Sequence, residues 1–215
     1  MKLFSREFFK RAATALVMSA LILLVFFYTP GVIFSILLAL VWAYAGTIEL
    51  PRLLLPSSPL FLPVLLIYLG IPLSFLILLN QGQHRLDLLV LIAIVAVFDT
   101  GSYVVGKLYG IHRIAPGISP GKTWEGFAGG LMTCLIGYLL AAHMAFNLSL
   151  IRTASDIFAI SIGAFLGDLF ESWLKRRAGV KDSGSILPGH GGILDRIDGL
   201  LGASLAIIFL RGLFF

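Results

Sequence analysis

The sequence predicts an all-α integral membrane protein, built as a polytopic bundle of about seven transmembrane helices. Hydrophobic residues make up 59% of the 215-residue chain and charged residues only 13%, whereas about a quarter of the residues in soluble domains are charged. Apolar runs of about 20 residues, the length that crosses a bilayer as a helix, recur along the chain. These observations exclude an ordinary soluble domain.

Seven candidate spans follow one another along the chain. They cover residues 12–29, 31–50, 59–79, 86–106, 124–143, 155–174 and 193–213. The third contains Pro63 and Pro72, and a proline inside a helix removes a backbone donor and favours a kink. The single cysteine, Cys134, excludes an intrachain disulfide and is best read as a packing residue.

The distribution of charge predicts the topology. With the amino terminus inside the cell, most of the 16 basic residues fall on the inner side. Cytoplasmic loops carry an excess of Lys and Arg, so the two long polar loops, 107–123 and 175–192, are predicted to face the cytoplasm. We therefore expect a multi-pass protein of the inner or plasma membrane. Among the acids within or beside the predicted spans, Asp87 and Asp156 map to the outer side.

Acidic residues gather at the cytoplasmic ends of three predicted helices. Asp99 lies in the fourth span, Asp168 and Glu171 end the sixth, and Asp195 and Asp198 begin the seventh. Each pair is spaced i, i+3 and shares one helix face. An ionised side chain costs about 2.5–3.5 kcal/mol at the bilayer centre, and clustered carboxylates call for a neutralising cation. Mg²⁺, which takes oxygen ligands beside phosphates, is the expected cofactor, and a second cation is left open.

A structural alternative stands beside the metal site. Asp195 with Arg196, and Asp168 and Glu171 with Lys175, could instead form ion pairs that join the helices. The two interpretations predict different responses of activity to metal concentration.

Two loops have the composition of phosphate-binding segments. In ISPGKTWEGFAGG, Ser119 lies in a turn, and Lys122 and Thr123 precede a predicted helix whose first amides can bind an anion. In KDSGSILPGHGGILDRIDG, glycines let the backbone approach a ligand and basic residues add charge. The candidate binding residues of this second region are Lys175, Arg176, Lys181, His190, Gly191, Gly192 and Arg196.

The segment SWLKRRAGVKDSGSILPGHGGILDRID, residues 172–198, resembles the signature of the phosphatidate cytidylyltransferases, also called CDP-diacylglycerol synthases. It contains a serine, a Lys-Arg pair, Lys-Asp, a glycine-rich turn, His-Gly-Gly and Asp-Arg-x-Asp in the family's order and spacing. The segments ISPGKTWEGFAGG and FDTGSYVVGKLYG resemble upstream blocks of that family. The similarity covers residues 99–202, whereas residues 1–80 carry only hydrophobicity and look shorter than in typical bacterial members.

This resemblance implies that the protein converts CTP and phosphatidic acid to CDP-diacylglycerol and pyrophosphate with Mg²⁺. Asp168 and Asp195 are the expected principal metal ligands, with Asp198, Glu171 and Asp99 as further candidates. The candidate catalytic residues are Asp168, Asp195, Asp198, Lys181 and Asp182. We accordingly divide the chain into amino-terminal helices, 1–85, as scaffold or lipid access route, and a catalytic membrane core, 86–215.

Two other functions remain open at this stage. A related cytidylyltransferase could act on a different lipid, such as archaeol phosphate, because no feature of the sequence indicates which lipid tails are recognised. An ion-coupled transporter could also carry intramembrane carboxylates, although its sites lie near the midplane and these acids lie near one face. The expected partners are CTP, phosphatidic acid and the bilayer, with no nucleic acid, and a homodimer is left open.

Overall fold

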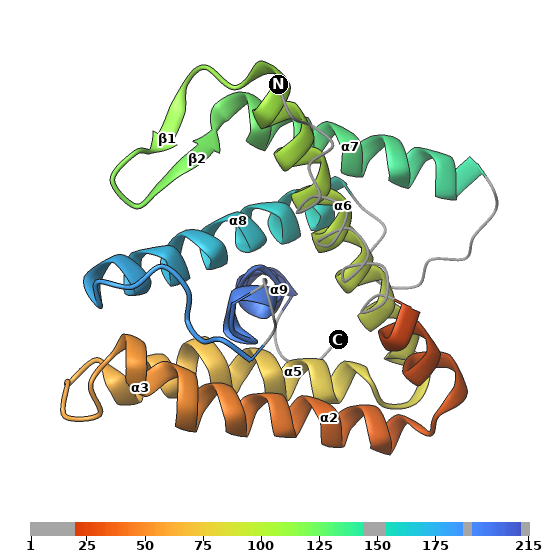
Figure 1. Ribbon diagram of the computed structural model, residues 1–215. Helices are drawn as coiled ribbons and strands as arrows, with labels where there is room; N and C mark the ends of the chain where they lie inside the picture. Colours follow the sequence, from red (N-terminus) through yellow and green to blue (C-terminus); the bar gives the residue numbers. More distant parts are fainter. Residues whose placement is uncertain (1–19, 144–153, 187–190, 212–215) are drawn as a thin grey trace.

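The structure is a computed structural model that describes residues 20–143, 154–186 and 191–211 (Figure 1). Residues 20–28 are helical. The elements that follow are α2 (Gly31–Tyr44), η1 (Ala45–Glu49), α3 (Leu50–Leu53), α4 (Phe61–Pro63), η2 (Val64–Gly70), α5 (Ile71–Leu79), η3 (Gly82–His84), α6 (Arg85–Tyr109), β1 (Arg113–Ala115), β2 (Ser119–Thr123), α7 (Trp124–His143), α8 (Ala154–Arg177) and α9 (Leu194–Arg211). The predicted all-α class is confirmed, with one small hairpin added.

Five helical segments of the described chain are long and apolar enough to cross a membrane. They are Gly31–Leu53, Phe61–Leu79, Arg85–Tyr109, Trp124–Ala141 and Ala154–Arg177, and they match the second to sixth predicted spans. The first predicted span lies largely outside the described residues. The seventh is helical as α9, but its charged residues keep it outside this apolar set. The expected count of seven is therefore not confirmed.

The proline-containing span has an irregular helix. Its middle part, η2, is a π-helix that ends directly before α5, and Pro72 lies in the first turn of α5. The same arrangement occurs earlier, where the π-helix η1 precedes Pro51 in α3. In both places the hydrogen-bonding pattern changes just before the residue that lacks an N–H. The change before Pro51 occurs at the junction of η1 and α3, and Glu49 is the last residue of η1.

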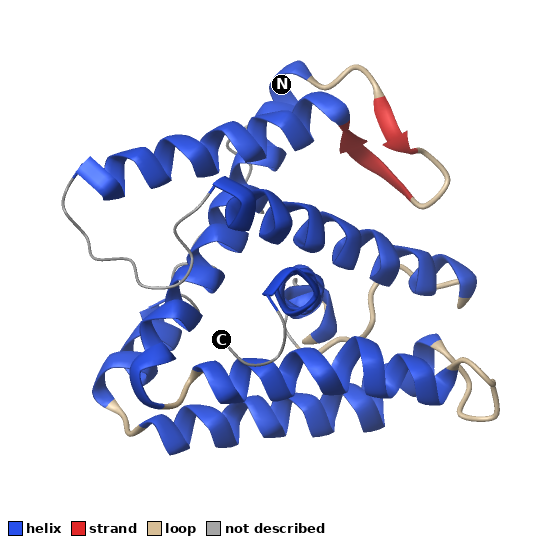
Figure 2. Ribbon diagram, turned by 180° about the vertical axis from the view of Figure 1, so that it is seen from behind, coloured by secondary structure: helices blue, strands red, loops and turns tan. Residues whose placement is uncertain are grey.

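Helix α9 occupies the middle of the molecule (Figure 1). It is seen end-on between α8 on one side and α5 on the other, and α2 lies alongside α5 in an outer layer (Figure 2). The contact of α8 with α9 is the most extensive one and depends on glycine. A Cβ atom on Gly167 would lie 2.3 Å from the carbonyl oxygen of Asp198, and one on Gly202 would lie 2.1 Å from that of Gly163. Only glycine permits this approach of the two backbones, as at many membrane helix contacts.

A short antiparallel hairpin lies beside the start of α7 (Figure 1). Strands β1 and β2 pair Arg113 with Thr123 and Ala115 with Ser119. The sequence predicted only a polar loop here, because Pro and Gly dominate the segment. Because β2 leads directly into α7, the hairpin positions Ser119 to Thr123 at one end of the helical bundle.

The two acids that mapped to the outer side are buried. Asp87 in the first turn of α6 is 1% exposed, and Asp156 in the first turn of α8 is 0% exposed. The Nδ1 atom of His84 lies 3.2 Å from an oxygen of Asp87. Asp156 is consequently part of the protein interior and not an inert surface residue.

Candidate functional site

A polar cavity of about 510 Å³ lies where α6, α8 and α9 meet the hairpin and the start of α7. Most of the predicted site residues line it, namely Asp99, Ser119, Lys122, Thr123, Asp168, Lys175, Asp182, Asp195, Arg196 and Asp198. Residues that the sequence analysis did not select complete the lining, namely Phe98, Ser102, Tyr103, Gly121, Gly126, Phe127 and Phe165. Residues far apart in the sequence therefore converge on one cavity.

Lys122 and Asp168 form an ion pair across this cavity. The Nζ atom of Lys122 lies 2.8 Å from Oδ2 of Asp168 and donates to the carbonyl oxygen of Phe165 at 3.2 Å. It also lies 4.4 Å from the centre of the Phe165 ring, in cation–π range. Ser172 donates to the other Asp168 oxygen at 3.2 Å. Asp168 is thus held in place, while 41% of its side chain remains accessible.

Lys175 joins two further acids. Its Nζ atom lies 2.6 Å from Oδ1 of Asp195 and also contacts Oε2 of Glu171, which is fully buried. The second oxygen of Asp195 accepts hydrogen bonds from the amide of Gly192 at 2.7 Å and from the amide and hydroxyl of Ser183 at 2.9 and 3.0 Å. Asp195 is therefore oriented from both sides, by the end of α8 and by the glycine-rich segment.

The ion-pair alternative is present in part. Lys175 pairs with Glu171 as that alternative supposed, but Asp168 pairs with Lys122 from the hairpin and not with Lys175. Asp195 pairs with Lys175 across the α8–α9 contact. Lysines therefore already provide positive charge next to three of the clustered carboxylates.

The donor set suits a divalent cation. Asp99, Asp168, Asp195 and Asp198 bring carboxylate oxygens to one cavity, which is the ligand type that Mg²⁺ takes. Glu171 has a buried oxygen, Oε1, without a hydrogen-bond partner among the described residues. In the same part of the chain, no three acidic, histidine or cysteine side chains are placed closely enough to hold a metal ion. The carboxylates are the right residue type for Mg²⁺, the predicted cofactor. In the present arrangement, lysines lie next to Asp168 and Asp195.

Gly191 requires the absence of a side chain. Its φ angle is +82°, and a Cβ atom there would lie 2.5 Å from Oδ2 of Asp195. The neighbouring Gly192 donates its amide to the same carboxylate. These two predicted binding residues thus shape the segment around Asp195 without lining the cavity themselves. His190, which was also predicted to bind substrate, lies outside the described residues.

Three other predicted residues have different surroundings from those expected. Arg176 donates to the carbonyl oxygens of Ile118 at 3.1 Å and Val180 at 3.2 Å, so it connects the end of α8 to the hairpin. Thr123 is buried, and its hydroxyl oxygen accepts the amide of Gly126 at 3.1 Å as a cap of α7. Lys181 is exposed and does not line the cavity.

Glu49 was not among the predicted site residues. This carboxylate is fully buried and accepts hydrogen bonds from the amides of Ile193 and Leu194 at 2.8 and 2.7 Å. The hydroxyl oxygen of Ser183 lies 3.3 Å from one of its oxygens. The available signal was a lone acid at the end of an apolar run, which is costly to bury without partners. Its partners lie in the carboxy-terminal half, so sequence spacing could not reveal them.

This chain is similar to one known protein family and to curated proteins from bacteria. The model of the cytidylyltransferase family matches residues 55–214. The chain is 46% identical over 123 residues to a phosphatidate cytidylyltransferase of Staphylococcus saprophyticus, covering 57% of this chain and 46% of that one. It is 43% identical over 131 residues to the phosphatidate cytidylyltransferase of Haemophilus influenzae, covering 58% and 45%.

The chain thus spans about half the length of the curated relatives it matches. The region matched by the family model contains α6 to α9 and hence every residue that lines the polar cavity. Because the family model matches most of the chain, this multi-pass membrane protein belongs to the cytidylyltransferase family, as the signature around Asp195 indicated.

Proposed function

We propose that this protein transfers CMP from CTP to phosphatidic acid, giving CDP-diacylglycerol and pyrophosphate for phospholipid synthesis. The observation that carries the proposal is the polar cavity at one end of the membrane helices, where lysines and carboxylates from separate segments meet. The names of the relatives support the choice of CTP and phosphatidate.

The reaction brings two anions together. A phosphate oxygen of phosphatidate attacks the α-phosphorus of CTP, a new P–O bond forms, and the bond to the departing pyrophosphate breaks. A phosphate monoester is already nucleophilic, so alignment and charge neutralisation are the main requirements. Lys122 and Lys175 have the charge and the position in the cavity to bind the phosphates.

Asp168, Asp195, Asp198 and Asp99 are the residues that would hold Mg²⁺ in this reaction. Glu171, which contacts Lys175, is a further candidate. When bound, the cation supplies positive charge that neutralises phosphate oxygens. Ser172, Ser183 and Gly192 hold two of these carboxylates in fixed orientations by hydrogen bonds. To hold the cation, Asp168 and Asp195 would exchange their contacts with Lys122 and Lys175 for contacts with the metal.

The cavity also has a side suited to the lipid. The rings of Phe98 and Phe127 are 5.7 Å apart, and those of Phe127 and Phe165 are 5.0 Å apart, both with edge-to-face geometry. These rings line the cavity next to Asp99 and Asp168. Phosphatidate in a bilayer carries its phosphate at the interface, so an aromatic wall beside polar groups suits a substrate with both characters.

The direct test uses purified protein in detergent with phosphatidate, Mg²⁺ and CTP labelled at the α-phosphate. We expect a labelled liponucleotide and an equal amount of pyrophosphate. Parallel reactions with archaeol phosphate or with ATP, GTP and UTP define the lipid and nucleotide selectivity. Release of labelled CMP without a lipid product, or no consumption of CTP, would overturn the proposal.

We further propose that the cavity faces the cytoplasm, because both basic loops contribute residues to its lining. Gly117 and Ser185 are exposed, so single cysteines at these positions in a Cys134→Ala background are suitable reporters. Ser183 is unsuitable because it is buried. Both reporters should resist a membrane-impermeant thiol reagent in intact cells and react after lysis. Labelling in intact cells would place the cavity on the outer side of the membrane and contradict the proposal.

A further inference from the structure

A carboxylate from the amino-terminal helices reaches into the segment that orients Asp195. Glu49 is the last residue of η1 and precedes the region 55–214 that matches the family model. Its partners, the amides of Ile193 and Leu194, lie 144 and 145 residues further along the chain. Glu49 therefore connects the outer helical layer to the start of α9.

The environment of Glu49 compensates for its burial. Burying an ionised carboxylate is costly unless it is hydrogen-bonded. The first amides of a helix have no partner within the helix and carry partial positive charge. Glu49 accepts two such amides, one on each oxygen, at the start of α9. A local Ser or Asp would be sufficient for a simple helix cap, whereas a carboxylate from another layer also determines where that helix begins.

The contacts of Glu49 continue to Asp195 through one hydroxyl. Oγ of Ser183 lies 3.3 Å from an oxygen of Glu49 and 3.0 Å from an oxygen of Asp195. A serine hydroxyl has one hydrogen and donates to one of the two at a time. Leu194, which donates its amide to Glu49, immediately precedes Asp195. A displacement of Glu49 would therefore reach Asp195 by two routes, through the hydroxyl and through the backbone.

The glycines of this segment leave space for the same carboxylate. A Cβ atom on Gly192 would lie 2.5 Å from Oε1 of Glu49, and one on Gly184 would lie 2.6 Å from it. The sequence predicted that glycines in this segment let the backbone approach a ligand. At these two positions the group that approaches is the Glu49 side chain.

We propose that Glu49 is a positioning residue for the transfer reaction. It holds Ser183 and residues 192–194 in the conformation in which Asp195 is presented to Lys175 and to the cavity. Its effect on catalysis rests on the proposed function, whereas its effect on the conformation of the segment does not. On this account the amino-terminal helices contribute to the active site through the Glu49 side chain.

The experiment compares wild-type protein with Glu49→Gln and Asn80→Ala. Gln keeps the volume of Glu but presents an NH₂ group to one of the two amides. Asn80 provides the matched control, because it is 2% exposed and donates to the carbonyl oxygen of Gly31 at 2.6 Å and to Ser35 at 3.0 Å, within the same outer layer. For each protein we measure kcat, KM for CTP, melting temperature in detergent and hydrogen exchange of the peptide 181–199.

We expect Glu49→Gln to lower kcat about 100-fold, the loss that a displacement of about 1 Å can cause. Its peptide 181–199 should exchange faster, and Asn80→Ala should leave both quantities within about twofold at an equal or larger loss of melting temperature. Ser183→Ala added to Glu49→Gln should lower kcat less than the two separate effects predict, because one network is already broken.

Wild-type kcat and exchange in Glu49→Gln would overturn the inference. Equal losses of kcat in Glu49→Gln and Asn80→Ala would also overturn it, since the effect would then follow general destabilisation. If the wild-type protein transfers no CMP, the proposed function fails. Unchanged exchange of the peptide 181–199 in Glu49→Gln would still overturn the positioning role in that case.

Discussion

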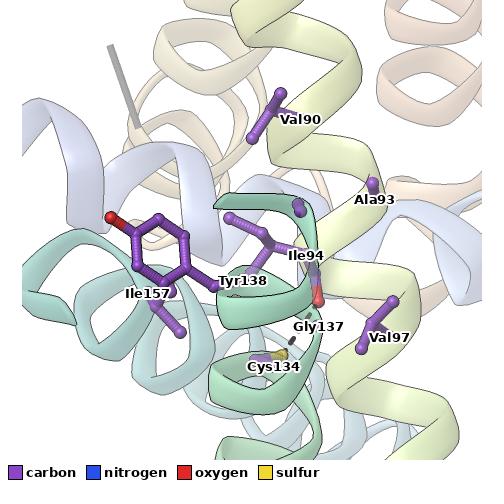
Figure 3. Close-up of a pocket in the computed structure, with 9 residues that line it drawn as sticks. Val90, Ala93, Ile94, Val97, Cys134, Gly137, Tyr138 and Ile157 are labelled. Carbon is purple, nitrogen blue, oxygen red and sulfur yellow. Dashed lines mark hydrogen bonds between the residues drawn. The ribbon is translucent and has the colours of Figure 1, made fainter. Parts of the chain in front are cut away.

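Helices α6, α7 and α8 line two cavities of opposite character. The first is the polar cavity of about 510 Å³ that contains Asp99 and Asp168. The second, of about 220 Å³, lies further along the same helices and is apolar. Its lining residues are Val90, Ala93, Ile94, Val97, Cys134, Gly137, Tyr138, Ala141 and Ile157 (Figure 3). Within it, the thiol of Cys134 donates to the carbonyl oxygen of Ile94 at 3.6 Å.

The two cavities differ in whether charged side chains line them. Val97 lines the apolar cavity, whereas Phe98 and Asp99, the next residues of α6, line the polar one. Both spaces arise from the crossing of the same helices, so a gap between helices is not by itself a site. The polar cavity differs because charged side chains from α9 and from the hairpin converge there. Part of this charge is paired, Asp168 with Lys122 and Asp195 with Lys175, which offsets the cost of burial.

The largest expected effect comes from removing the charge of Asp195, which lines the polar cavity. Asp195→Asn keeps the side-chain volume but loses the ion pair with Lys175 and a candidate metal ligand. We expect kcat to fall about 100- to 1000-fold, the range for loss of one essential electrostatic group. Ser204→Ala is the control, since Ser204 is buried in the same helix and donates to the carbonyl oxygen of Leu200 at 2.8 Å. Similar activities of the two variants would remove Asp195 from the site.

A smaller loss is expected from a cation of the polar cavity. Lys122→Met retains the length of the chain but removes the positive charge that faces Asp168. A hydrogen bond to a charged group contributes about 1.5–3 kcal/mol, so kcat/KM for CTP should fall about 10- to 100-fold. Arg177→Met removes an equal charge from the end of α8, where the guanidinium stacks on Trp173 outside the cavity. The assignment of Lys122 is wrong if both variants lose the same activity.

Sequence alone could predict the five apolar spans because each is determined by local composition. It also predicted that Asp168 and Asp195 lie near one another, since both belong to compact motifs, and both line the polar cavity. The pairing of Asp168 with Lys122 could not be predicted, because it depends on how the hairpin folds against α8. Glu49 was missed for the same reason, since its contacts join segments more than 130 residues apart. Hydrophobic periodicity contains no information about such long-range contacts.

The next prediction distinguishes metal binding from ion pairing in the polar cavity. Asp168→Glu keeps the charge but moves the carboxylate by about one bond length, and Mg²⁺ tolerates distorted geometry poorly. We expect the Mg²⁺ concentration for half-maximal rate to rise about tenfold at an unchanged melting temperature, with partial rescue by Mn²⁺. Superimposable metal curves with a lower melting temperature would instead assign Asp168 to a structural ion pair with Lys122.

The smallest effect is expected from a substitution in the apolar cavity. Ala141→Leu adds apolar volume to a space without charged groups among its lining residues. In a membrane the gain comes from packing rather than from water exclusion, so we expect a stabilisation below about 1 kcal/mol. The rate of CMP transfer should stay within about twofold of wild type.

The matched change in the polar cavity is Ser119→Leu, which places similar apolar bulk among the groups proposed to bind phosphate. It should lower kcat/KM for CTP about tenfold at nearly constant melting temperature, because an apolar group there displaces hydrogen-bonding partners of a charged ligand. Melting temperature and initial rate, measured side by side for both variants, show whether the apolar cavity is part of the active site. If Ala141→Leu reduced the rate as strongly as Ser119→Leu, the apolar cavity would belong to the active site, and the division between the two spaces would not hold.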